Sequence, residues 1–131
     1  DRENLILFQG KTVFVIMNRF PYNNGHLMVV PYRHLSDYNE LKENELLEIA
    51  KVTQMSIDVL KKTMNPQGFN IGFNLGASAG AGIAEHIHQH IVPRWNGDTN
   101  FMPVLCHTKV QVDGLCECWD ELRAEFEKRK S

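Results

Sequence analysis

The sequence contains little cysteine, and its three cysteines form no recognisable framework. Cys106, Cys116 and Cys118 are odd in number and include no Cys-x-x-Cys pair. A disulfide-stabilised fold is therefore not expected. Free thiols are typical of a reducing compartment, and the sequence predicts a cytoplasmic protein.

Long apolar runs and an excess of one charge are also missing. No apolar run approaches the roughly 20 residues of a bilayer-spanning helix, and the N-terminal residues lack the basic-then-apolar pattern of a signal peptide. The 14 Lys and Arg residues against 16 Asp and Glu residues give a net charge of −2. Nucleic-acid polymers and membrane surfaces are bound mainly by clustered positive charge, so neither partner is expected. A phosphorylated ligand would need local hydrogen-bond donors.

The 131 residues, of which 43% are apolar and 23% charged, predict a single domain over residues 1–131. Runs of β-branched and aromatic residues predict strands at 5–8, 12–18, 26–32, 69–75 and 83–93. Apolar residues at helical spacing predict a long helix within 39–64 and a C-terminal helix from residue 114 onward. This order predicts an α+β fold with a mainly antiparallel sheet.

The most informative segment is His86-Ile87-His88-Gln89-His90. On a strand, neighbouring side chains point to opposite faces, so all three imidazoles would project from one face, about 6.6 Å apart along the chain. Core packing is a poor explanation for three histidines on one face. Two kinds of chemistry remain: His-x-His pairs supply zinc ligands, and a neutral imidazole is a nucleophile that attacks phosphorus.

A loop of small residues, Ser78-Ala79-Gly80-Ala81-Gly82, precedes this segment. Its glycines allow consecutive backbone N–H groups to point into one concavity, which binds phosphate oxygens without a cationic side chain. Taken alone, such a loop is more often a structural hairpin. Next to three in-line histidines in a net-acidic chain, it predicts an anion-binding loop beside a nucleophile.

These segments resemble the histidine triad (HIT) family. The similarity covers roughly residues 13–101 and includes, besides the histidines, Asn74-Leu75-Gly76, the loop up to Glu85, Val92-Pro93-Arg94-Trp95-Asn96-Gly97-Asp98-Thr99-Asn100-Phe101 and an upstream Asn…Gly-His strand pair. The last part of this pattern is most similar to bacterial diadenosine tetraphosphate phosphorylases and HIT-type hydrolases. The resemblance implies a HIT-like fold and a homodimer whose sheet continues across the interface.

The resemblance also implies a mechanism. His88 would attack the α-phosphorus of a dinucleoside polyphosphate or another nucleoside-monophosphate conjugate, and water or inorganic phosphate would then cleave the nucleotidyl-histidine. His90 would contact the phosphate or help to protonate the leaving group, and His86 would complete the ring network. The implied substrate-binding residues are Asn18, His26, Asn74, Ser78, Gly80, Ala81 and Gly82.

Some of these residues have more specific implied roles. His26 would pack against the ring network, Asn18 would hold the ribose hydroxyls, and Asn74 would reach the scissile phosphate. The base pocket would be walled by three apolar residues, which core packing alone explains nearly as well: Phe14, Ile16 and Leu27.

The sequence departs from the family pattern in three places. Gln89 occupies a position that is usually apolar, where its side chain would point away from the site, to an interface or solvent. Gly82 and Ile83 stand where many members have Gln and Ser or Thr, so phosphate donors would be mostly backbone groups. The N-terminal Cys pair that binds structural zinc in many bacterial members is missing from this sequence.

No cofactor is therefore expected to be required. Zinc is expected only if a Cys pair precedes this chain, with His34 as a further ligand. Two other functions stay open from the residues themselves: a purine-nucleotide-binding module with little turnover, and a zinc site on the histidine strand.

Overall fold

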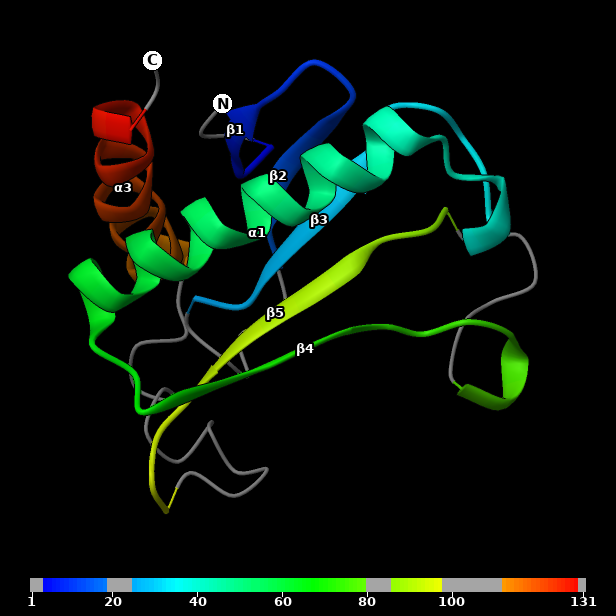
Figure 1. Cartoon of the computed structure of the whole chain (residues 1–131). Coiled ribbons are helices and arrows are strands. Elements are labelled where there is room, and N and C mark those ends of the chain that lie inside the picture. Colours follow the sequence, from blue (N-terminus) through cyan, green and yellow to red (C-terminus); the bar gives the residue numbers. More distant parts are fainter. Residues whose placement is uncertain (1–3, 19–24, 80–85, 98–111, 130–131) are drawn as a thin grey trace.

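The computed structural model describes residues 4–18, 25–79, 86–97 and 112–129 (Figure 1). The elements in chain order are β1 (Ile6–Gln9), β2 (Val13–Met17), β3 (Leu27–Pro31), a 3₁₀ turn (Tyr38–Glu40), α1 (Glu43–Met64), β4 (Gly68–Phe73), a second 3₁₀ turn (Ala77–Ala79), β5 (Gln89–Arg94) and α3 (Val112–Arg129).

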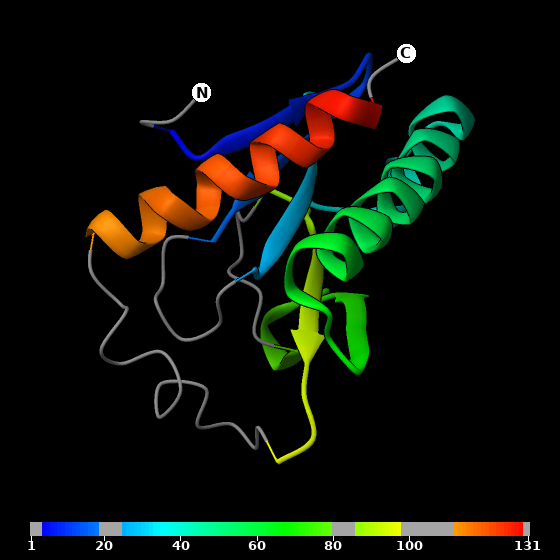
Figure 2. The same ribbon diagram turned by 90° about the vertical axis from the view of Figure 1, so that its left-hand side faces the viewer.

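The five strands form one antiparallel sheet in the order β1-β2-β3-β5-β4. Helix α1 lies across one face of this sheet, and α3 lies against α1 and β1 (Figure 1 and Figure 2). The α+β fold predicted from the sequence is confirmed, with its antiparallel sheet, long helix and C-terminal helix. Because β3 and β5 are neighbours, segments some sixty residues apart in the chain are brought together at the centre of the sheet.

Two-residue alternation gives the sheet two different faces. The face covered by the helices is fully buried and forms the core with the apolar side of α1; it includes Val13, Val15, Met17, Leu27, Val29 and Ile91. We call the opposite face the site face. Its half-buried side chains include Phe14, Ile16, Met28 and His90.

Local sequence explains the limits of α1. The helix begins at Glu43, later than the predicted boundary at residue 39, because the Asp37 carboxylate accepts a hydrogen bond from Asn39 N (2.9 Å) and organises a separate 3₁₀ turn. It ends as predicted, because Asn65 adopts a left-handed conformation with φ 51° and Pro66 cannot extend a helix.

Two strand predictions were too long. The strand expected at 83–93 begins only at Gln89; residues 83–85 lie outside the described part of the chain, and residues 86–88 precede the ladder. The strand expected at 69–75 ends at Phe73, because the chain turns at Gly76, whose φ is +83°. No helix in the described ranges is long and apolar enough to cross a membrane.

Candidate active site

The candidate site lies on the site face, where β3 and β5 run side by side. Met28 pairs with His90 in the ladder, and His26 immediately precedes β3. The ring centroids of His26 and His90 are 5.1 Å apart, and those of His88 and His90 are 4.6 Å apart in a T-shaped arrangement. We call His26, His88 and His90 the histidine cluster.

His86 belongs to a different contact. Along residues 86–91 the three histidines are half-buried and alternate with fully buried neighbours, as expected for one common face, even though the strand starts only at residue 89. The His86 ring, however, packs edge-on against His34, with centroids 4.9 Å apart. The structure therefore brings together a cluster of three imidazoles and a separate His34–His86 pair.

The hydrogen bond of His88 fixes where its proton lies. His88 Nδ1 is 2.9 Å from the backbone oxygen of His86. A carbonyl oxygen only accepts hydrogen bonds, so Nδ1 must carry the hydrogen, and in the neutral ring Nε2 then carries the lone pair. This tautomer is the one a nucleophile requires, with the lone pair on the nitrogen farther from the backbone.

His26 is held in the neutral form between two partners. Its Nδ1 is 3.0 Å from Nδ2 of Asn18, and its Nε2 is 2.9 Å from Nδ1 of His90. Burial, together with repulsion from charged forms of His90 and His88, lowers the pKa of His26 from 6.5 to about 4. His26 is therefore uncharged at neutral pH.

Backbone and side-chain contacts behind the cluster hold its segment in place. Ile87 N donates to Leu35 O (2.8 Å), on the chain that leaves β3. Gln89 is buried, and its amide donates to Thr53 Oγ1 (2.6 Å) on α1. Gln89 points away from the site, as predicted, but the expected destination was wrong: it is the long helix, not an interface or solvent.

The predicted phosphate-binding residues are described only in part. Asn74 is exposed and directly follows Phe73, whose partner in the ladder is Gln89, so Asn74 lies at the end of β4 nearest His88. Ser78 is exposed in a 3₁₀ turn closed by a hydrogen bond from Ala79 N to Gly76 O (3.1 Å). The other three predicted residues lie outside the described part of the chain: Gly80, Ala81 and Gly82.

One predicted wall of the base pocket is wrong. Phe14 and Ile16 do lie on the site face, but Leu27 is fully buried on the opposite face, under the helices. Met28 is the β3 residue that lies on the site face there, between Ile16 and His90 in the ladder. The signal was available in the sequence: Met28 is two residues from His26 and therefore shares its face.

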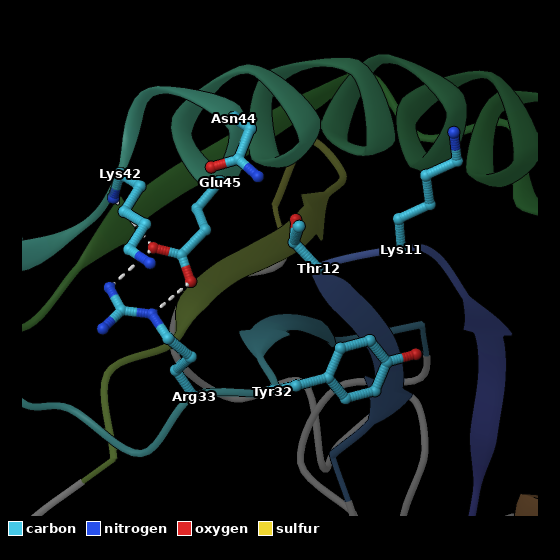
Figure 3. Close-up of a pocket in the computed structure, with 7 residues that line it drawn as sticks. All are labelled: Lys11, Thr12, Tyr32, Arg33, Lys42, Asn44 and Glu45. Carbon is cyan, nitrogen blue, oxygen red and sulfur yellow. Dashed lines mark hydrogen bonds and ion pairs between the residues drawn. The ribbon is translucent and has the colours of Figure 1, made fainter.

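A pocket near the start of α1 contains none of the predicted site residues. Its volume is about 220 Å³, and its lining consists of Lys11, Thr12, Tyr32, Arg33, Lys42, Asn44 and Glu45 (Figure 3). Arg33 donates from Nε and Nη2 to the two carboxylate oxygens of Glu45 (2.9 and 2.8 Å). The hydrogen bonds from Arg33 lower the pKa of the buried Glu45 to about 2. This ion pair fixes the chain just before His34 and Leu35, and so supports the site indirectly.

Metal binding can be tested on the His34–His86 pair. His86 Nε2 is buried and has no hydrogen-bond partner among the described residues, as expected for a nitrogen available to a ligand. In the same part of the chain, no group of three or more His, Cys, Asp or Glu side chains is placed to hold a metal ion. The His34–His86 contact brings together only two candidate ligands in the described part of the chain, whereas a structural zinc site has four.

Comparison with known protein sequences gives a consistent result. The sequence model of the HIT domain matches residues 2–97. Over 110 residues the chain is 49% identical to a Mycobacterium tuberculosis protein named AP-4-A phosphorylase, which covers 84% of this chain and 56% of that protein. Over 93 residues it is 34% identical to an uncharacterised HIT-like protein of Methanocaldococcus jannaschii, covering 71% of this chain and 70% of that protein. The chain thus spans little more than half of the mycobacterial relative.

Two solved structures illustrate the same fold. A zinc-bound histidine triad family protein from Mycobacterium smegmatis aligns with a TM-score of 0.76 at 24% identity, over 96% of this chain and 86% of that one. Diadenosine triphosphate hydrolase of Plasmodium falciparum aligns with a TM-score of 0.77 at 19% identity, over 98% of this chain and 80% of that one. At these identities the likeness establishes the fold.

Proposed function

Because this chain belongs to the HIT domain family, we propose that it is a nucleotidyl hydrolase or transferase whose nucleophile is His88. Its substrates are dinucleoside polyphosphates or other conjugates of a nucleoside monophosphate. The observation that carries the proposal is the contact of His88 Nδ1 with His86 O (2.9 Å), from which it follows that Nε2 carries the lone pair, beside the ring of His90.

The reaction has two displacements. In the first, His88 Nε2 forms a bond to the α-phosphorus while the bond from phosphorus to the leaving nucleotide's oxygen breaks. In the second, water or inorganic phosphate attacks the same phosphorus, and the phosphorus–nitrogen bond breaks to regenerate the neutral ring; when water is the acceptor, its proton is released to the solvent. Two such steps are each easier than one direct substitution, because imidazole is both a good nucleophile and a good leaving group.

The remaining site residues have supporting roles in this proposal. His90 contacts the phosphoryl oxygens, His86 orients His88 through its backbone carbonyl, and Asn18 holds the ribose hydroxyls. The base lies against the apolar part of the site face, formed by Ile16 and Met28. The phosphate is bound by Asn74 and by the loop that contains Ser78, Gly80, Ala81 and Gly82.

The identity of the acceptor is tested by the products. The name of the M. tuberculosis relative, AP-4-A phosphorylase, supports phosphate as the acceptor. We expect diadenosine tetraphosphate with added phosphate to yield ADP and ATP, and without phosphate to yield AMP and ATP more slowly. Anion-exchange chromatography of the products separates the two routes. Tight AMP binding without turnover of any phosphoanhydride or phosphoramidate would instead identify a binding module.

The structure also supports a site for the proposed dimer. Strand β4 is an edge strand of the described sheet, and its Ile71 is 43% exposed. An edge strand offers unpaired backbone groups to a second copy, and an exposed apolar residue on that strand favours burial there. We propose that two copies pair along β4, which continues the sheet across the interface.

Ile71→Glu should therefore weaken the dimer by at least about tenfold, because it places a charge in an apolar contact. Sedimentation velocity over a dilution series measures the change. Leu47→Glu is the matched control, since Leu47 is an exposed apolar residue on α1, 57% accessible. A dimer that survives Ile71→Glu but dissociates with Leu47→Glu would show that the interface lies on α1 and not on β4.

A further inference from the structure

A chain of two hydrogen bonds connects Asn18, at the end of β2, to His90 on β5. Asn18 Nδ2 is 3.0 Å from His26 Nδ1, and His26 Nε2 is 2.9 Å from His90 Nδ1. The three side chains come from three neighbouring segments of the sheet, because Asn18 N also donates to His26 O (2.9 Å) and β3 pairs with β5. We call this chain the relay.

The relay has a direction that follows from its first member. The amide nitrogen of Asn18 only donates, so His26 Nδ1 must accept and carries the lone pair. Since His26 is neutral, its one hydrogen lies on Nε2, which donates to His90 Nδ1. His90 Nδ1 therefore carries a lone pair, and the hydrogen of a neutral His90 lies on Nε2.

We propose that Asn18 is a positioning residue which, acting through His26, fixes His90 as a hydrogen-bond donor at Nε2. This inference rests on the proposed function, because the proposed function gives the His90 Nε2 donor its role at the phosphoryl oxygens. This positioning role is compatible with the ribose contact implied for Asn18, because the relay uses the nitrogen of the amide and does not use its oxygen.

The consequence is a pair of adjacent imidazoles with opposite roles. His88 presents a lone pair at Nε2 because its Nδ1 donates to His86 O, whereas His90 presents an N–H at Nε2 because its Nδ1 accepts from His26. One ring attacks phosphorus and the other stabilises negative charge on the phosphoryl oxygens, and neither needs to be charged. The relay ends on an amide, which supplies no proton, so His90 donates a hydrogen bond and keeps its hydrogen. A nucleoside polyphosphate leaves as an anion and takes none.

The substitution Asn18→Asp reverses the direction of both hydrogen bonds in the relay and leaves the size of the side chain unchanged. A carboxylate only accepts, so His26 must carry its hydrogen on Nδ1 and accept at Nε2 from His90. His90 Nε2 then loses its hydrogen, and we expect kcat to fall by about 100-fold at neutral pH, as for the loss of one preorganised donor. The expected change in KM is smaller than that in kcat, because the lost hydrogen bond is strongest where negative charge builds up on the phosphoryl oxygens in the transition state.

Lowering the pH should rescue this variant. The carboxylate introduced by Asn18→Asp favours protonation of His26, whose other titratable neighbours are the rings of His90 and His88. Protonated His26 carries hydrogen on both nitrogens and donates again to His90 Nδ1, so the ratio of the variant's kcat to the wild-type kcat at the same pH should rise as the pH falls. Asn18→Leu, which has similar size and no hydrogen bond, should show a smaller loss, about tenfold, and no such recovery.

Nitrogen-15 NMR of the histidine rings tests the relay without any substrate. In the wild-type protein, Nδ1 should be the pyridine-type nitrogen in both His26 and His90; in Asn18→Asp at neutral pH, it should be the pyrrole-type nitrogen in both. Hydrogen on Nδ1 of His26 in the wild type, or an Asn18→Asp variant whose kcat relative to the wild type at the same pH does not rise at low pH, would overturn the inference. The expected tautomers in a protein without turnover would preserve the relay and reject the proposed function. Turnover through His88 in a protein with the reverse tautomers would reject the relay and preserve the proposed function.

Discussion

Replacing His88 with alanine is expected to lower kcat for diadenosine tetraphosphate by at least about 1,000-fold and to abolish any covalent nucleotidyl adduct. No other ring in the cluster can take over its role. His26 Nε2 and His90 Nδ1 are engaged with each other, and the relay places hydrogen on His90 Nε2. Loss of the nucleophile forces a direct displacement by water or phosphate, which gives up the advantage of two easier steps.

Intact-protein mass spectrometry, after brief incubation with substrate in the absence of phosphate, measures the adduct. The wild-type protein should gain the mass of one adenylyl group, and the variant should not. His88→Gln is the matched control, because it keeps a polar side chain of similar length without a nucleophilic nitrogen, and it should be equally inactive. Both variants should still bind AMP within a few-fold of the wild type. An adduct on either variant would assign the nucleophile to another residue.

The fold and the composition of the histidine cluster were largely predictable because both depend on short periodicities. Two-residue alternation placed His88 and His90 on one face, and the runs around residues 12–18 and 26–32 predicted strands that pair as observed. The resemblance added His26, which contacts His90 as part of the ring network. Predicting these features requires only the local sequence and the pairing of one pair of strands.

What could not be predicted depends on packing between distant segments. The sequence shows that Gln89 faces away from the site, but not that Thr53 on α1 lies 2.6 Å from its amide. Similarly, three alternating histidines suggest one common set, whereas a neighbouring ring, His34, draws His86 into a separate contact. The choice of Leu27 as a pocket wall failed for a different reason: apolar character alone does not reveal which face of a strand is covered by helices.

The C-terminal helix α3 lies beyond the part of the chain that matches the HIT domain, yet its packing predicts that it belongs to the same folded unit. Phe126 is 1% exposed, and its ring lies 6.0 Å from that of Phe8 on the edge strand β1. Trp119 Nε1 donates to Ile6 O (3.0 Å), and Arg123 Nη1 donates to Leu7 O (3.2 Å). The helix therefore covers β1 with both apolar contacts and hydrogen bonds.

Phe126→Ala should lower the free energy of unfolding by about 3–5 kcal/mol, because it removes buried aromatic surface and leaves a cavity between α3 and β1. Since domains of this size are stable by only about 5–15 kcal/mol, the loss should be obvious in urea unfolding followed by circular dichroism. The control is Glu127→Ala on the same helix, whose side chain is 47% exposed and forms a surface ion pair with Arg123; it should cost at most about 1 kcal/mol. If α3 folds with the rest, the wild-type protein unfolds in one transition and Phe126→Ala shifts all of it. A change confined to a separate early transition would show instead that α3 unfolds on its own.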